Sequence, residues 1–287
     1  VIPHPNGDRD QVWVSVRRAV TGVAEVTTPS DPFDKVVLLM HFEGSAGETP
    51  ELLTGGFIDS TGRRAEGFAT GAPIALSATQ VKFGATSLAI GSAVNLALAD
   101  HADWDFSSND FTIETFVFFD AYPTSSVINA ASIWSQDGAA QKFAPVNFAI
   151  GNSGKLRLWA SSTGTSWDLF NDVKGTNAVG LGAQHHLALT RQGSTFRFFI
   201  DGAVDATFSA SGALVTSSDF VNIGRFQNDA TSFNGYIDEL RVTNGAAWYT
   251  GAFTPPTAPF ALTGAVATAA ASTVTERRYV EYFDDTG

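Results

Sequence analysis

Residues Phe111–Phe119 read FTIETFVFF, an alternating run in which both sets of side chains are largely apolar. In an extended chain, successive side chains point to opposite faces, so the odd-numbered residues share one face and the even-numbered residues the other. Ile113 and Val117 make the first face apolar, and Phe116 and Phe118 do the same for the second. The run therefore predicts a strand that is covered on both sides.

Strand and turn patterns recur through the rest of the middle of the chain. Phe148 and Ile150 precede the turn residues Gly151–Gly154 and the run Lys155–Ala160, which predicts a hairpin. The same arrangement follows in His185–Thr190, Thr195–Ile200 and, after Asp201-Gly202, Val204–Ser209. Short strands without intervening helical patterns predict an all-β fold, a jelly-roll sandwich of two antiparallel sheets.

Composition narrows the possible partners. The 287 residues carry 17 Lys+Arg against 29 Asp+Glu, and a net charge of -12 disfavours direct contact with nucleic acid. The absence of cysteine excludes disulfides, zinc-thiolate sites and thiol nucleophiles. The stretch Ala261–Thr275 is too short and too polar to span a bilayer, so no membrane insertion is expected. The chain starts with Val1 rather than methionine, and Val1–Asp10 is too polar for a secretory signal, so we interpret the chain as a fragment of a longer protein.

The two ends differ from the middle and suggest three parts: a flanking strand and linker over residues 1–33, the sandwich over 34–262, and a linker and strand over 263–287. Val12–Arg18 and Arg277–Phe283 are alternating runs that can pair with each other. On this interpretation the sandwich is inserted into a hairpin, which requires its own ends to lie close together. The alternative is two flexible tails.

Several segments of the middle part carry a family resemblance. They are Val36–Phe42, Phe57–Gly62, Lys82–Ile90, Asp103–Phe119 and Phe233–Arg241. In this order they resemble LamG-like domains of the concanavalin A-like lectin/glucanase superfamily, which are jelly rolls of two antiparallel sheets. The run Asn244–Pro256 looks most like the members carried by bacteriophage structural proteins.

The flanks add a second resemblance. Asp8–Arg18 and Thr275–Asp285 are similar to the two strands of one hairpin in the tail nozzle proteins of short-tailed phages. This implies a structural protein of the phage virion, facing outward from the tail in a homo-oligomeric ring with other virion proteins as partners. The lectin-like domain would then offer its loops to host-surface glycans. The alternatives are a decoration domain that only stabilises the particle and a free-standing carbohydrate-binding module.

The carboxylates do not suggest hydrolysis. Glycoside cleavage needs two carboxyl groups on either side of the scissile bond. Hydrolases of similar fold carry a Glu-x-Asp-x-x-Glu or Glu-x-Asp-x-Glu run, and the sequence contains neither. Glu114 stands alone in its strand, and the neighbours Asp238 and Glu239 are expected to point to opposite faces. We therefore predict that the protein is not an enzyme, with a glycosidase or lyase as the disfavoured rival.

The superfamily resemblance also implies a structural Ca²⁺ where the first strand, an early glycine turn and the last strand meet. By position, the candidates are Glu43 and Gly44, Gly84, and Asp238. Carboxylates and backbone carbonyls are the hard oxygen ligands that Ca²⁺ prefers. The alternative is that Asp238 caps backbone amides or pairs with Arg241.

Sugar binding favours an exposed aromatic ring beside polar hydrogen-bonding groups. Trp167 lies in the polar stretch Ser161–Asp172, where no periodic pattern demands its burial, and Asp168 and Asn171 stand beside it. These three residues are the predicted carbohydrate site. The alternative is that Trp167 is a packing anchor. His185 and His186 are not expected to share a metal ion, because neighbours on a strand face opposite ways.

Overall fold

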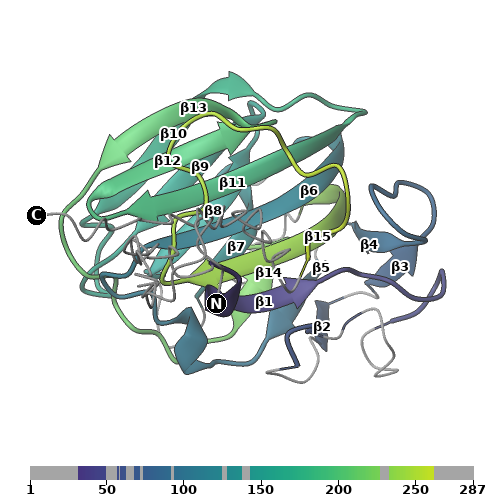
Figure 1. The fold of residues 1–287 in the computed structure, drawn as a ribbon, viewed down its shortest axis with the longest axis horizontal. Coiled ribbons are helices and arrows are strands. Elements are labelled where there is room, and N and C mark those ends of the chain that lie inside the picture. Colours follow the sequence, from purple (N-terminus) through teal and green to yellow (C-terminus); the bar gives the residue numbers. More distant parts are fainter. Residues whose placement is uncertain are drawn as a thin grey trace, which may run out of the picture. The chain divides into compact units, whose positions relative to one another are not determined.

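Antiparallel strands make up most of the regular structure (Figure 1). The computed structural model describes residues 32–49, 57, 59–62, 68–71, 74–91, 94–124, 128–137, 143–226 and 233–261. All of these residues belong to one compact unit. Val12–Arg18 and Arg277–Phe283 lie outside them, so the pairing of these two segments stays a prediction.

The described strands form two sheets. Sheet A contains, in spatial order, β13 (Ala203–Ser209), β12 (Thr195–Ile200), β11 (Gln184–Gln192), β6 (Phe111–Ala121), β15 (Asn234–Asn244), β4 (Ser87–Ile90) and β3 (Ala75–Ser77), with β1 (Val36–Met40) paired to β15. Sheet B contains β10 (Phe170–Ala178), β9 (Lys155–Ala160), β8 (Val146–Gly151), β7 (Ala130–Gln136), β14 (Val221–Ile223), β5 (Val94–Leu98) and β2 (Phe68–Gly71). The pairs within each sheet are antiparallel, which confirms the predicted sandwich. The short 3₁₀ helices are η1 (Pro32–Lys35) and η4 (Ala102–Trp104).

None of the helical turns in the described residues is long and apolar enough to cross a membrane.

The main core lies between the two sheets, and β6 is central to it. Ile113 and Val117 of β6 are fully buried in this core, as the alternation of the strand predicted. Phe148 of sheet B stacks on Phe198 of sheet A with ring centroids 5.7 Å apart. On the other face of β6, Phe116 belongs to a second apolar cluster, so this strand is covered on both sides.

A β-bulge interrupts β15 between Asp238 and Arg241, where the pairing register with β6 shifts and Glu239 adopts a φ of 53°. Ile237 and Leu240, three positions apart, both face the main core. Strict alternation would place inward side chains two positions apart, so the bulge turns both intervening residues out of the core. The expectation that Asp238 and Glu239 point to opposite faces is therefore wrong.

Residues 245–261, here called the C-terminal segment, cover the outer face of sheet A after β15 ends (Figure 1). Trp248 N donates to Thr112 Oγ1 at 2.9 Å, and Thr190 Oγ1 donates to Tyr249 O at 3.0 Å. Phe260 N, near the end of the segment, donates to Glu239 Oε2 at 2.8 Å. These bonds place the segment across β6, β11 and β15.

Both ends of the described chain meet at Arg241. Its guanidinium carbon lies 4.3 Å from the ring centroid of Phe260 and 6.0 Å from that of Phe33. Trp248 covers the same guanidinium at 4.1 Å, and its ring meets Phe33 edge-on at 4.8 Å. The entry and the exit of the domain are therefore neighbours on the outer face of sheet A.

Candidate functional site

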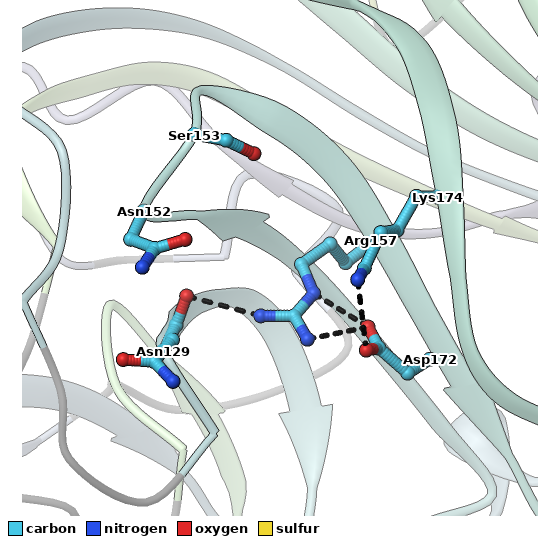
Figure 2. A pocket seen from close by; sticks show the side chains of 6 residues that line it. All are labelled: Asn129, Asn152, Ser153, Arg157, Asp172 and Lys174. Carbon is cyan, nitrogen blue, oxygen red and sulfur yellow. Dashed lines mark hydrogen bonds and ion pairs between the residues drawn. The ribbon is translucent and has the colours of Figure 1, made fainter.

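A polar pocket of about 270 Å³ opens on the outer face of sheet B (Figure 2). On β9, Leu156 and Leu158 point into the main core, so Arg157 between them points outward. The turn between β8 and β9 and the start of β7 supply one wall, and β10 supplies the other. The lining residues are Asn129, Asn152, Ser153, Arg157, Asp172 and Lys174.

Arg157 forms the rigid floor of this pocket and is only 7% exposed. Its Nη1 donates to Ile128 O at 2.6 Å and to Asn129 O at 3.0 Å, and its Nε donates to Asp172 Oδ1 at 2.6 Å. The guanidinium also lies 4.5 Å from the ring centroid of Trp159. A charged group with this many partners holds one geometry, and it connects the residues before β7 with Asp172 of β10.

Two of the lining residues have an unusual backbone. Asn129 has a φ of 54° and Asp172 a φ of 62°, both in the left-handed region. Asn and Asp are among the residues that tolerate this region best, but it remains sparsely populated and recurs at functional sites. Both positions therefore carry a residue type that suits their backbone conformation.

The remaining groups of the pocket are open to a ligand. The side chains of Asn129, Asn152 and Ser153 are exposed, and within the described residues they make no side-chain hydrogen bond. Lys174 Nζ lies 3.3 Å from Asp172 Oδ2 and its side chain is 54% exposed. Amide, hydroxyl, ammonium and carboxylate groups that converge in this way suit a ligand rich in hydroxyl groups.

Trp167 and Asn171, from the predicted carbohydrate site, do not line this pocket. Trp167 is partly buried against the small cluster of Ala130, Ala149 and Trp159, and Phe143 meets its ring at 5.2 Å. Trp159 packs in the same cluster as Trp167, and its ring lies against the Arg157 guanidinium. Trp159 therefore connects Trp167 with the pocket. Asn171 is exposed on β10, next to the lining residue Asp172.

Asp168 is occupied by its own loop. Its Oδ1 accepts from Ser161 Oγ and Ser162 N, both at 3.0 Å, and Ser162 Oγ bonds its Oδ2. Chiefly because of the Ser162 hydroxyl, the pKa of Asp168 is lowered to about 2. Trp167 therefore packs like an anchor and Asp168 shapes a loop, while the glycan-binding role of the three residues stays a prediction.

The residues predicted to bind calcium come together around residues 82–85. Glu43 Oε2 accepts from Ala85 N at 2.8 Å, and a Cβ at Gly84 would lie 1.6 Å from Glu43 Oε1. Asp238 Oδ2 accepts from Lys82 N at 2.8 Å and from Phe83 N at 3.1 Å. Asp238 therefore caps backbone amides, as the alternative interpretation proposed.

The residues around Glu43 and Asp238 fit a cation only in part. Asp238 Oδ1 is buried and has no hydrogen-bond partner in the described part of the chain. Burial, assisted by the charges of Glu239 and Glu43, raises the pKa of Asp238 to about 7. A cation would relieve both features, but among the described residues no three side chains of metal-ligating type gather. Backbone carbonyls or water would have to complete the shell.

Two other buried carboxylates, Glu114 and Glu239, serve the fold. Glu114 pairs with Arg241 and contacts His186 Nε2 at 3.1 Å, and all three are buried under the C-terminal segment. His185 faces the other way and its Nδ1 contacts Asp201 Oδ2 at 2.7 Å, so the two histidines do diverge as predicted. Glu239 holds His41 Nδ1 at 2.8 Å and is 1% exposed.

A comparison with protein-family models gives one match, over residues 91–247, to the concanavalin A-like lectin/glucanases superfamily. The match spans more than half of the 287 residues. The chain belongs to the concanavalin A-like lectin/glucanases superfamily. The predicted superfamily is thereby confirmed. A comparison with curated proteins finds no match.

Several solved structures are similar to this chain. Domain 4 of AbnA, a GH43 extracellular arabinanase from Geobacillus stearothermophilus, in complex with arabinotriose, is 19% identical with a TM-score of 0.53, over 74% of this chain and 93% of that one. The CBM40 of the Ruminococcus gnavus IT-sialidase, bound to α2,3 sialyllactose, is 15% identical with a TM-score of 0.45, over 56% and 90%. Trypanosoma rangeli sialidase is 13% identical with a TM-score of 0.48, over 75% and 31%. The likeness to the arabinanase domain shows the fold.

The pocket itself was missed from the sequence. Its residues come from four places: the residue before β7, the β8–β9 turn, β9 and β10. The one local signal was the outward Arg157 within KLRLWA, a charge flanked by inward leucines. Pairing of β9 with β10 then brings Lys174 opposite Arg157.

Proposed function

We propose that this protein is a non-catalytic carbohydrate-binding domain that holds a sugar in the pocket of sheet B. The observation that carries the proposal is the set of polar groups left open around Arg157: the Asn129 and Asn152 amides, the Ser153 hydroxyl and Lys174 Nζ. Sugars are recognised by such groups, placed in advance on a rigid frame. The fold of the superfamily is compatible with this role.

The carboxylates support a non-catalytic role. Asp172 is the one carboxylate among the described pocket-lining residues, and Arg157 and Lys174 both contact it. Glycoside hydrolysis needs a second carboxyl group across the bond. Although the bulge places Asp238 and Glu239 on the same side, both are 1% exposed and no substrate can reach them there.

Binding can be tested with the full chain on a glycan array, followed by calorimetry on each hit. Ser153→Ala and Asn152→Ala remove pocket groups from an exposed turn and should weaken binding about five- to tenfold without lowering the thermal midpoint. Thr207→Ala, on the exposed edge strand β13 of sheet A, is the matched control. Binding that is lost in Asn171→Ala but unchanged in the turn variants would place the ligand at the Trp167 site instead.

We further propose that the domain is displayed by a phage tail component, a nozzle protein or a relative of one. The resemblance of the flanks and of Asn244–Pro256 motivates this proposal. It is supported by Phe33 and Phe260, which contact the same guanidinium, because a domain inserted into a hairpin needs neighbouring ends. The partners would be other virion proteins, further copies in a ring, and host-surface glycans.

A density map of the assembled particle tests this second proposal. We expect Val12–Arg18 to pair with Arg277–Phe283 in each copy of a ring, with the sandwich projecting outward. Absence of the chain from any particle would leave a free-standing carbohydrate-binding module. A particle-bound domain that binds no glycan would be a stabilising decoration domain.

A structural Ca²⁺ at Glu43, Gly84 and Asp238 is a third proposal. The unpartnered Asp238 Oδ1 is the observation in its favour. Glu43 and Asp238 would be the side-chain ligands, and the ion would neutralise charge that burial leaves poorly solvated.

A further inference from the structure

We propose that the pocket of sheet B selects a sugar that carries a carboxylate, such as a uronic or sialic acid residue. This inference rests on the proposed carbohydrate-binding function and names its ligand class. The groups that would recognise the carboxylate are Lys174, Asn152 and Ser153, with Arg157 beneath them (Figure 2).

Charge is the first argument. The pocket contains two cations, Arg157 and Lys174, and one carboxylate, Asp172, so its formal charge is 2 - 1 = +1. The whole chain carries -12. A positive pocket on an acidic protein attracts an anion locally, while the surrounding surface repels anions that do not fit.

The balance of donors and acceptors is the second argument. Lys174 offers only N–H donors, whereas the two lining amides and the Ser153 hydroxyl each offer donors and an acceptor oxygen. Asp172 is the only pure acceptor among them. Its Oδ1 receives Nε and Nη2 of Arg157, and its Oδ2 faces Lys174. A carboxylate, which only accepts hydrogen bonds, suits the donor-only Lys174 and can also accept from the amides and the hydroxyl, and it pairs with the Lys174 charge as a neutral hydroxyl cannot.

The Asp172 carboxylate already contacts Lys174 in the way that the carboxylate of the ligand would. It occupies one side of Lys174, whose side chain is 54% exposed and can turn its other N–H groups to a second carboxylate. Asn at this position would keep the shape of the side chain and also tolerates a positive φ. Asp172→Asn should therefore raise the affinity for an acidic sugar by removing the competing charge.

The test compares each acidic sugar with its own methyl ester, using the full chain in calorimetry. The probes are D-glucuronate, N-acetylneuraminate and their methyl esters, in which the charge is removed and one methyl group is added. We expect the acid to bind about five- to tenfold more tightly than the ester, with the difference falling as salt rises. The glucuronate and neuraminate arms distinguish the two sources of the carboxylate.

Two variants make the test specific to the pocket. Lys174→Gln changes an exposed side chain and should bring the acid-to-ester ratio close to one, whereas Lys174→Arg should retain the preference. Asp172→Asn should raise affinity for the acid about fivefold, because one competing ion pair is removed. Its thermal midpoint shows whether Arg157 stays in place.

The outcomes separate the proposed preference for a carboxylate from the proposed carbohydrate-binding function on which it rests. Equal binding of acid and ester, or weaker binding of acid by Asp172→Asn at an unchanged midpoint, would overturn the carboxylate preference while a carbohydrate-binding pocket remained. A glycan array with no ligand at all, acidic or neutral, would overturn both.

Discussion

Glu114 on β6 and Arg241 on β15 form an ion pair on the outer face of sheet A, with Arg241 Nε and Nη2 at 2.8 and 2.7 Å from Glu114 Oε1. Tyr249 of the C-terminal segment donates its hydroxyl to Glu114 Oε2 at 2.7 Å. Burial favours a higher pKa for Glu114, but the Arg241 charge and the bonds from His186 and Tyr249 hold it below the ordinary value. The carboxylate thus joins three strands and the C-terminal segment.

Removal of one residue of the Glu114–Arg241 ion pair should lower the stability of the protein. Glu114→Ala leaves Arg241 buried without a counter-charge, and we expect the free energy of unfolding to fall by about 3 to 5 kcal/mol. Urea unfolding followed by tryptophan fluorescence measures this. Asp120→Ala, at an exposed position of the same strand, should change stability by less than about 0.5 kcal/mol. A loss below about 1 kcal/mol in Glu114→Ala would show that water reaches the pair.

Asp205 should protect an edge of the sandwich. β10 and β13 are the edge strands of their sheets, and Asp205 of β13 accepts from Thr176 N at 3.2 Å and Asn177 N at 2.8 Å of β10. Asp205→Ala should cost about 1 to 3 kcal/mol and promote association that depends on concentration, because it frees edge amides. Light scattering at increasing concentration measures this, with Thr207→Ala as control. A monomeric variant of unchanged stability would argue against the role.

The raised pKa of Asp238 predicts how stability depends on pH. In the folded protein this carboxyl stays protonated up to about pH 7, against a reference pKa of 3.8. Between these values only the folded form binds the proton, so the contribution of Asp238 to stability falls as pH rises.

The stability of the wild type relative to Asp238→Asn should therefore decline from pH 4 to pH 7, by at most about 1.4 kcal/mol per pH unit. Chemical unfolding of both proteins across this range, with chelator present, gives the difference directly. A difference that stays flat over the range would mean that Asp238 ionises normally.

Calcium should offset the loss of stability that ionised Asp238 causes at high pH. If Ca²⁺ binds Glu43 and Asp238, the thermal midpoint of the wild type at pH 8 should be higher in calcium than in EGTA, since an ion that binds only the folded state stabilises it. Magnesium at the same concentration is the control. Asp238→Asn should show no such rise, and the same midpoint in calcium and EGTA for the wild type would leave amide capping as the role of Asp238.

The elements with strong alternation could be predicted from the sequence. FTIETFVFF became β6, and KLRLWA became β9 with its stated bounds, because both runs carry their burial pattern within themselves. Within the run Lys82–Ile90, which carries part of the family resemblance, only Ser87–Ile90 is a strand, β4. Lys82 N and Phe83 N bond a side chain of β15 instead, a contact over more than 150 residues that no local pattern reveals.

The candidate site was harder to predict than the fold. The bulge at Glu239 changed the direction of two carboxylates, and a positive φ at a glutamate has no sequence signature. Trp167 drew attention because it stands in a polar stretch, yet its burial depends on Phe143 and Trp159 from other strands and loops. The pocket depends on the register between β9 and β10, which is a tertiary property.

The place of Arg241 has a mechanical consequence. The chain enters and leaves the domain on the outer face of sheet A, whereas the pocket opens on the outer face of sheet B. Any pull between a captured ligand and the rest of the protein would therefore pass through the full thickness of the sandwich. The packed core between the sheets would be one of the elements that carry this load.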